Sequence, residues 1–375
     1  MSDRIANEAS QQASAPGAYS LAEILSQPQC WRNCLKELQA DPVIGEIIDR
    51  FANAPEWIFI GCGSSYYIAL SAAASWSAIT GVRARAIPAS ELLLFPDLVL
   101  AGVGEFVPVL ISRSGHTSEV LRAAQLLNQK HIRSIAISCA PKQQLEELAT
   151  VSILLPAADE QSTVMTRAFT SMLLGLQYLA ASLAKDRQFV DALQALPKVA
   201  ENALQDVPGR IREFANLNKF SDYVCLGQGP YYGLACESAL KLTEMSCSYA
   251  QAFHTLEFRH GPKSIVSGET LISFLLSETN YDAEVDLLEE IKSLGGATLV
   301  VANRLNPRAR AATDLSIELN CDLPEYARLA PYVFAGQLMG AYVALQKGLD
   351  PDHPRNLSRV VILEDDEPEP QNATI

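Results

Sequence analysis

The sequence predicts an α/β fold with two tandem, doubly wound parallel-sheet domains behind a helical lead-in. Strand-length apolar runs alternate with segments of helical spacing, which is typical of a parallel sheet covered by helices on both faces. Residues 223–235 also repeat residues 57–69 at an offset of 166, with two glycines, a tyrosine, an alanine and the apolar run in register. Two like α/β domains commonly hold a ligand near the carboxyl ends of their strands, so the repeat indicates a binding site there.

The predicted elements follow from local patterns along the chain. Ser20 to Glu23 match a helix-capping pattern and open the helical lead-in, which is interrupted at Pro28. Apolar runs and the repeat predict strands at 57–60, 84–87, 107–111, 134–138, 151–155, 223–226, 270–276, 297–302 and 315–319. Helical spacing predicts a long helix within 160–183, a bridging stretch over 189–214 and a closing helix over 332–349.

These elements divide the chain into five parts. We expect disorder over 1–19, the helical lead-in over 20–52, a first domain over 53–190, a linker helix and second domain over 191–350, and a C-terminal segment with an acidic tail over 351–375.

Composition narrows the function classes. The chain has 375 residues, of which 49% are apolar and 19% charged, an ordinary mixture for a globular protein. The net charge is -14, to which 364–369 contribute five negatives, so nucleic acid is not an expected partner. There is neither an eighteen-residue uncharged apolar stretch nor a signal-peptide pattern, so we expect a cytoplasmic protein with no membrane partner. The eight cysteines have no metal-site spacing, and we expect neither a metal nor a cofactor.

Residues 109–119 combine an apolar strand with a hydroxyl-rich turn and the start of a helix. This order directs backbone N–H groups and the hydroxyls of Ser112, Ser114 and Thr117 at one point on the positive end of a helix dipole, where a phosphate would bind. The alternative is an ordinary helix cap, because serine and threonine are favoured there in any case.

A charged row follows the second glycine-rich turn. Glu237, Lys241 and Glu244 are spaced to project from one face of a helix. Such a row is most often a solvated salt-bridge ladder. Near a glycine turn, in a helix otherwise rich in apolar residues, one of the carboxylates could instead move a proton between adjacent carbons of a sugar.

Two of the five histidines lie at 254 and 260. Gly261 and Pro262 end any helix directly after His260, which places that imidazole on a turn. His260 is therefore a candidate general acid or base near neutral pH, with a merely capping or packing histidine as the alternative.

Taken together, these residues resemble the double SIS (sugar isomerase) domain family, whose domains are flavodoxin-like. The resemblance covers roughly residues 20–362 and includes the isomerase half of glucosamine-6-phosphate synthase and the stand-alone SIS-type glucosamine-6-phosphate deaminases. Six motifs carry it in the family's order: Gly61 to Tyr67, Ser112 to Thr117, Met165 to Thr170, Glu237 to Glu244, Glu257 to Pro262 and Pro354 to Leu357.

The resemblance implies a role for each matching residue. Glu244 is expected to be the base that shuttles a proton between C1 and C2, with Glu237 and Lys241 orienting it. His260 is expected to open the sugar ring in the active site of a neighbouring subunit, which implies a homodimer. The remaining residues are expected to bind a phosphosugar substrate, the hydroxyl turn taking its phosphate: Gly63, Ser64, Ser65, Ser112, Arg113, Ser114, Thr117, Thr163 and Arg359.

Three departures from the synthase pattern shape the expected reaction. No glutaminase domain precedes residue 20, so we expect no glutamine-derived ammonia. Arg359 stands at the position of the synthase's Schiff-base lysine, and a guanidinium is a poor amine nucleophile. Arg113 replaces a glutamine and is expected to add a bidentate donor beside the phosphate.

These features favour an enzyme that isomerises and deaminates an amino-sugar 6-phosphate, converting glucosamine 6-phosphate to fructose 6-phosphate and ammonia. Three alternatives stay open at this point: a deglycase acting on a phosphorylated fructose-amine, a sugar-phosphate sensor without turnover, and an ammonia-dependent, synthase-like isomerase.

Overall fold

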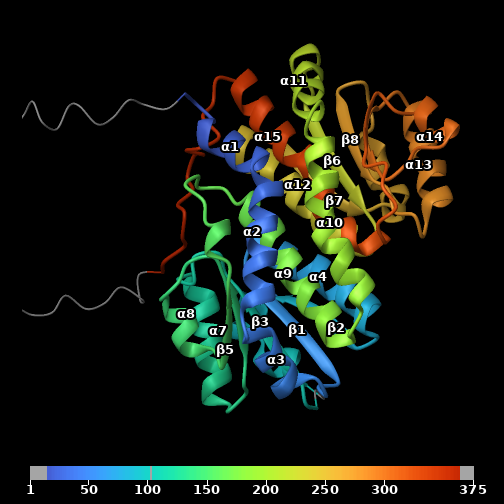
Figure 1. Cartoon of the computed structure of the whole chain (residues 1–375). Coiled ribbons are helices and arrows are strands. Elements are labelled where there is room, and N and C mark those ends of the chain that lie inside the picture. Colours follow the sequence, from blue (N-terminus) through green and yellow to red (C-terminus); the bar gives the residue numbers. More distant parts are fainter. Residues whose placement is uncertain (1–14, 102–103, 364–375) are drawn as a thin grey trace, which may run out of the picture.

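The computed structural model describes residues 15–101 and 104–363, and these form two parallel five-stranded sheets with helices on both faces (Figure 1). Most of the predicted N-terminal disorder and the acidic tail lie outside the described residues. In the first sheet the strand order is β2-β1-β3-β4-β5, and the second sheet reads β7-β6-β8-β9-β10 from its corresponding edge. The predicted tandem α/β fold is therefore confirmed. The strands are β1 (Glu56–Gly61), β2 (Arg83–Pro88), β3 (Val107–Ile111), β4 (Ile135–Ser138), β5 (Val151–Leu154), β6 (Asp222–Gly227), β7 (Tyr249–His254), β8 (Thr270–Leu275), β9 (Ala297–Ala302) and β10 (Leu315–Glu318).

Strand β7 is the one strand that the apolar runs do not predict. It is an edge strand paired only with β6, and its residues are half-buried or exposed. Its first-domain counterpart, β2, is also an edge strand with little full burial. The offset of 166 that relates β1 to β6 also relates β2 to β7, so the repeat contained the missing signal.

The lead-in consists of α1 (Ala18–Leu25), α2 (Gln27–Ala40) and α3 (Val43–Phe51). The predicted interruption falls just before Pro28, which occupies the first turn of α2. Proline is tolerated there because the first N–H groups of a helix have no intrahelical partner.

The remaining helices cover the two sheets and connect them. Around the first sheet are α4 (Ser64–Thr80), α5 (Ala89–Leu94), α6 (Pro96–Leu100), α7 (Ser118–Gln129), α8 (Gln144–Leu148), η1 (Pro156–Ala158) and α9 (Arg167–Ala184). The connection is made by α10 (Arg187–Ala203) and α11 (Val207–Leu217). Around the second sheet are α12 (Tyr231–Ser246), η2 (Leu256–Arg259), η3 (Pro262–Ile265), α13 (Tyr281–Ser293), α14 (Pro307–Ala311), η4 (Glu325–Arg328), η5 (Ala330–Val333) and α15 (Phe334–Gln346).

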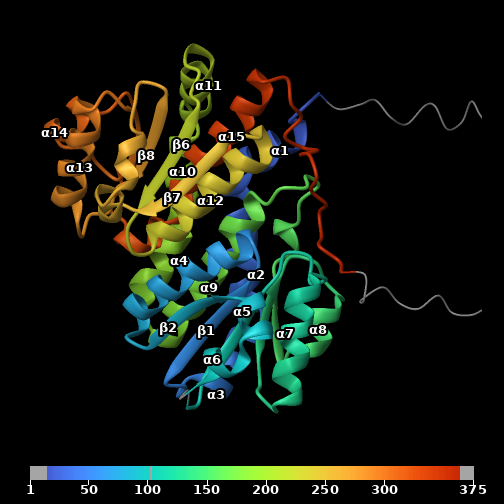
Figure 2. The ribbon, with the colours of Figure 1, turned by 180° about the vertical axis from the view of Figure 1, so that it is seen from behind.

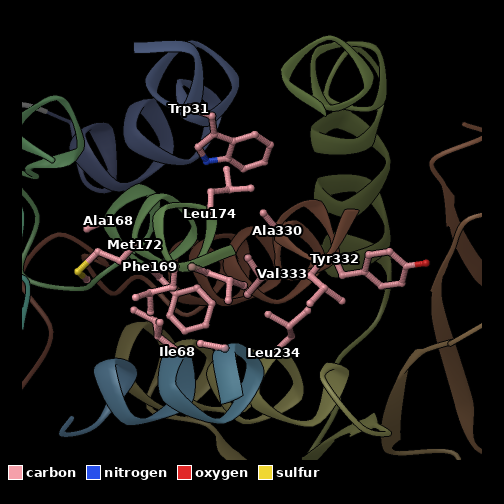
Figure 3. Packing of buried hydrophobic residues seen from close by; sticks show 14 of the residues in the cluster. Trp31, Ile68, Ala168, Phe169, Met172, Leu174, Leu234, Ala330, Tyr332 and Val333 are labelled. Carbon is pink, nitrogen blue, oxygen red and sulfur yellow. The ribbon is translucent and has the colours of Figure 1, made fainter. Parts of the chain in front are cut away.

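One apolar core joins the lead-in to both sheets. Figure 3 shows Trp31 of α2, Phe169 of α9, Ile68 of α4 and Leu234 of α12 converging on this region. The indole of Trp31 stacks on Phe334 with ring centroids 5.6 Å apart. Because this single core contains buried residues from both halves of the chain, the two domains pack together through their inner helices.

Helix α12 lies in the middle of this packing, against α4 and α15. Gly340 of α15 approaches the α12 backbone so closely that a Cβ there would lie 2.8 Å from the carbonyl oxygen of Lys241. This contact requires a glycine, and it helps to bury the middle of α12. Figure 2 shows α12 between α4 and α15 from behind.

The C-terminal segment after α15 returns along the outside of the first domain (Figure 1). Its backbone joins α7, because the Ser118 N–H donates to the Val361 carbonyl at 3.2 Å and the Leu363 N–H donates to Ser118 Oγ at 2.9 Å. Among the described helices, none has both the length and the apolar character needed to span a membrane.

Candidate active site

A cavity of about 200 Å³ opens at the carboxyl ends of the first-domain strands. Its walls come from four parts of the chain: the β1–α4 turn, the β3–α7 turn, the loop before α9, and the C-terminal segment. One residue of α12, Glu244, also reaches it. The predicted site residues that line it are Gly63, Ser64, Ser65, Arg113, Ser114, Thr117, Thr163, Glu244 and Arg359.

The β3–α7 turn has the hydroxyl arrangement that the sequence predicts. Ser112 Oγ lies 3.2 Å from Thr117 Oγ1 and accepts the Gly115 N–H at 3.1 Å. Ser112 is buried and does not line the cavity, whereas Ser114 and Thr117 do. Ser112 therefore shapes the turn, and the other two hydroxyls are placed to meet an anion at the start of α7.

The β1–α4 turn supplies the wall beside this cradle. A Cβ on Gly61 would lie 2.6 Å from the carbonyl carbon of Ser65, so α4 can begin this close to β1 only with glycine at that position. Gly63 has a φ of 52°, in the left-handed region that glycine adopts readily. These two glycines turn Ser64 and Ser65 to the cavity.

The charged row of α12 is buried, not solvated. Glu237 and Lys241 are 0% exposed, and the Glu244 side chain, at 19%, is the one that reaches the cavity. Lys241 Nζ lies 2.5 Å from Glu244 Oε2 and 3.2 Å from Glu237 Oε1, and it donates to Ser64 Oγ at 3.3 Å. The solvated-ladder alternative is therefore wrong for this row.

Burial sets the protonation of the row. It raises the pKa of Glu237 to about 7, although the Lys241 ammonium opposes the rise. Burial favours the neutral amine of Lys241, but the two carboxylates outweigh it and raise its pKa above the ordinary value. Lys241 therefore stays charged at neutral pH and holds the carboxylate of Glu244 in place, while Glu237 is close to its own titration point.

Arg113 is engaged by the protein. Its Nη1 lies 3.4 Å from Glu160 Oε2, and its Nη2 donates to the carbonyl oxygens of Thr163 at 3.1 Å and Arg359 at 2.8 Å. The side chain is 5% exposed. The expected bidentate donor to a phosphate is thus replaced by a clamp that ties two walls of the cavity to the β3–α7 turn.

The C-terminal segment forms the outer wall through Leu357 to Val361. Arg359 pairs with Asp159, with Nη2 2.6 Å from Oδ1, and its side chain is 44% exposed. The guanidinium therefore lies at the rim, where a ligand's polar groups can reach it. The sequence analysis did not predict Glu160 and Asp159 as site residues, because their arginine partners are distant in the chain. The one local indication was that this acidic pair lies just before the Met165–Thr170 motif.

Comparison with known proteins gives this arrangement a family. A family model described as the SIS domain matches residues 50–182, which contain most of the walls just described. The chain carries a SIS domain. Its second sheet has the same strand order as the first, so the fold is that of tandem SIS domains.

The chain is similar over most of its length to glutamine–fructose-6-phosphate aminotransferases (isomerizing). It is 26% identical over 347 residues to the protein of that name from Methanothermobacter thermautotrophicus, covering 92% of this chain and 58% of the relative. The protein of that name from Idiomarina loihiensis is 29% identical over 389 residues, with 96% of this chain and 62% of the relative covered. The chain thus spans 58% to 62% of the length of these relatives.

A solved structure matches most of the chain. The glucosamine-6-phosphate deaminase from Thermotoga maritima superposes with a TM-score of 0.75 at 28% identity, covering 92% of this chain and 99% of that one.

The turn of the second SIS-like sheet that corresponds to the cradle is already occupied. It follows β8, the counterpart of β3, and leads into α13. Glu325 Oε1 accepts the Glu278 N–H at 2.7 Å, and Glu325 Oε2 accepts the Thr279 hydroxyl at 2.7 Å. The chain's own carboxylate thus uses the donors of the second turn, which leaves the cavity of the SIS domain at 50–182 as the candidate ligand site.

His260 lies apart from this cavity. It is exposed, it ends η2 as the sequence predicts, and it is not among the residues that line the cavity. Its neighbour His254 stacks on Tyr232 with ring centroids 3.8 Å apart. Within the part of the chain that the structure describes, no cluster of three or more His, Cys, Asp or Glu side chains is arranged to hold a metal ion.

Proposed function

We propose that this chain is a phosphosugar isomerase that deaminates glucosamine 6-phosphate to fructose 6-phosphate and ammonia. The observation that carries the proposal is the Glu244 carboxylate, which reaches a cavity beside a hydroxyl cradle while a buried ammonium holds it at 2.5 Å. A fixed carboxylate beside an anion cradle suits proton transfer on a sugar phosphate. The similarity to the deaminase of Thermotoga maritima supports the same class of substrate.

The proposed reaction uses the residues in sequence. The substrate phosphate binds at Ser114 and Thr117, which fixes the sugar carbons relative to Glu244. In the open-chain aldehyde, Glu244 removes the proton on C2, giving an enolamine, and returns a proton to C1. The product is the C2 imine, and water hydrolyses it to the ketone and ammonia.

The rest of the α12 row would tune this base. Lys241 holds the Glu244 carboxylate in position before the transfer through their ion pair. Glu237 titrates near neutral pH, so it can offset the positive charge that Lys241 carries when Glu244 accepts a proton. The row would thus keep the charge in the site nearly constant through the reaction.

Arg359 bears on which sugars react. Because a guanidinium is a poor amine nucleophile, Arg359 would bind substrate oxygens and would not form a Schiff base with a ketose. We therefore expect amino-aldose phosphates to react by ring opening without a covalent intermediate.

Ring opening is proposed to use His260 from a second copy of the chain. His260 is exposed and lies outside the cavity of its own chain, as a residue that serves a partner's site would. Mixing a His260→Gln chain with a Glu244→Gln chain, each inactive alone, should restore activity in mixed dimers. Random pairing predicts about one quarter of wild-type activity, because half the dimers would have one intact site of two. A mixture as inactive as its components would refute the shared site.

The decisive experiment follows ammonia and fructose 6-phosphate together during incubation with glucosamine 6-phosphate. Both should form in equal amounts, and Glu244→Gln should lower the rate by about 10²- to 10⁴-fold, the usual contribution of a general base. Glu213→Gln, an exposed substitution on α11, serves as the matched control and should keep full activity.

The other outcomes point to other reactions. Sugar interconversion without ammonia would indicate an isomerase. Turnover only of a phosphorylated fructose-amine would indicate a deglycase, and formation of glucosamine 6-phosphate from added ammonia and fructose 6-phosphate would indicate synthesis. Tight binding without any product would indicate a sensor.

A further inference from the structure

Helix α1 precedes the residues matched by the SIS domain, yet it carries a buried carboxylate directed at the candidate site. Glu23 is 4% exposed. Its Oε1 accepts the Gln161 N–H at 2.5 Å and the Ser162 N–H at 3.4 Å. Its Oε2 accepts the Ser162 hydroxyl. All three donors belong to the loop before α9, about 140 residues further along the chain.

The loop that Glu23 holds is a wall of the cavity. Thr163 to Met165 line it directly after Ser162. Residues 159–166 contain no helix or strand, so their buried N–H groups need acceptors other than those of a regular backbone ladder. Glu160 accepts the Thr166 N–H at 2.6 Å. Glu23 accepts the N–H groups of Gln161 and Ser162, the two residues just before those that line the cavity. Without Glu23 this half of the loop would lose its acceptors.

The other end of α1 is joined to the second irregular wall. The N–H groups of Tyr19 and Ser20 donate to Asp352 at 3.0 and 2.7 Å, and the Ser20 hydroxyl donates to it at 2.6 Å. Asp352 is 3% exposed and begins the segment that forms the outer wall five residues later. Figure 2 shows this segment passing from α1 toward α7. Helix α1 therefore contacts both irregular walls of the cavity.

We propose that Glu23 is a positioning residue for the site: through Gln161 and Ser162 it fixes the loop that presents Thr163 to the sugar part of the substrate. This inference rests on the proposed function. None of the hydrogen bonds of Glu23 reaches the hydroxyl turn, whose Ser112 hydroxyl accepts the Gly115 N–H within the turn. Loss of Glu23 should therefore weaken recognition of the sugar and leave recognition of phosphate unchanged.

The experiment compares Glu23→Ala with Glu37→Ala, an exposed substitution on the neighbouring helix α2. Titration calorimetry measures affinity for glucosamine 6-phosphate and for inorganic phosphate, and hydrogen exchange measures protection of the Gln161 and Ser162 amides. Glu23→Ala should weaken sugar-phosphate binding about tenfold, as loss of charge-assisted hydrogen bonds implies, change phosphate affinity by less than about twofold, and speed exchange at both amides. Glu37→Ala should match the wild type in all three.

Two milder variants test the same contacts in case Glu23→Ala does not fold. Ser162→Ala removes one contact from the loop side, and Glu23→Gln keeps one acceptor oxygen, so both should lie between wild type and Glu23→Ala. In steady-state kinetics all three should raise KM more than they lower kcat, because the loop binds substrate and transition state alike.

The failures of the two proposals are distinguishable. A wild-type chain that does not bind glucosamine 6-phosphate would refute the proposed function. If the wild type binds it and Glu23→Ala binds it equally well, or if amide exchange at 161 and 162 is unchanged, the positioning role of Glu23 is wrong. Equal loss of sugar-phosphate and phosphate affinity would also overturn it, since that result means a general structural defect.

Discussion

The charge row on α12 gives a prediction about stability that does not depend on the substrate. Glu237 is completely buried, and burial raises its pKa to about 7 from the ordinary value of 4.5. The folded chain therefore binds a proton at this carboxyl between pH 4.5 and 7, where the unfolded chain has released it. Its stabilising contribution is complete below the lower value and is lost as the pH rises through the upper one.

The size of the effect follows from the two pKa values. Linkage gives a loss of about 2.5 kcal/mol in the free energy of unfolding between pH 5 and pH 8 for this carboxyl alone. Glu237→Gln keeps the shape of the side chain and cannot ionise, so its stability should lack this loss. Relative to wild type, the variant should therefore gain about 2.5 kcal/mol across the same interval.

Urea unfolding at intervals of half a pH unit from 5 to 8 measures this difference. Other buried groups titrate in the same range, Glu284 among them, and subtraction of the variant from the wild type removes their contribution. Glu213→Gln, exposed on α11, should track the wild type throughout. Parallel curves for wild type and Glu237→Gln would show that Glu237 is ionised in the fold at pH 5 and would refute the proposed electrostatics of the row.

Two further substitutions test the walls of the cavity, and a third tests the turn after β8. Gly61→Ala places a methyl group 2.6 Å from the Ser65 carbonyl carbon, so the free energy of unfolding should fall by about 2 kcal/mol in urea and sugar-phosphate affinity should drop with it. Arg113→Gln should lower stability by about 3 kcal/mol, because a buried carboxylate loses its partner, and should speed amide exchange over 357–361; unchanged exchange there would contradict the clamp. Glu325→Ala frees the donors of the second turn, so calorimetry should find a second inorganic phosphate per chain where wild type binds one.

The sequence predicts the fold well where burial is complete. The runs at 57–60, 107–111 and 134–138 became the inner strands β1, β3 and β4, because an apolar run with no alternation suits a parallel strand covered on both faces. Strand β7 was missed because an edge strand is only partly covered and its residues need not be apolar. A register argument finds it, because the repeat that aligns 57–69 with 223–235 also aligns β2 with β7.

The site is predictable only as far as its residues are local in sequence. Turns and helix faces place Ser114, Thr117 and Glu244, since the relevant spacing lies within one element. The partners of Arg113 could not be predicted, because its guanidinium bonds to carbonyls 50 and 246 residues away. The role of Glu23 could not be predicted for the same reason. In the sequence it is one carboxylate in an amphipathic helix, and its partners depend on how that helix packs against the loop.

The internal repeat places corresponding turns in the two halves of the chain, and the two turns have different surroundings. Both sheets end their third strand in a turn whose N–H and hydroxyl groups favour an anion. In the second half, the loop after β10 delivers Glu325 into that turn, and the donors are satisfied within the chain. In the first half, the corresponding loop after β5 is hydrogen-bonded to Glu23 and Arg113. The carboxylate of this loop, Glu160, bonds to Arg113 and Thr166. The way in which each loop is held therefore decides whether the turn bonds to the chain's own carboxylate or faces a cavity.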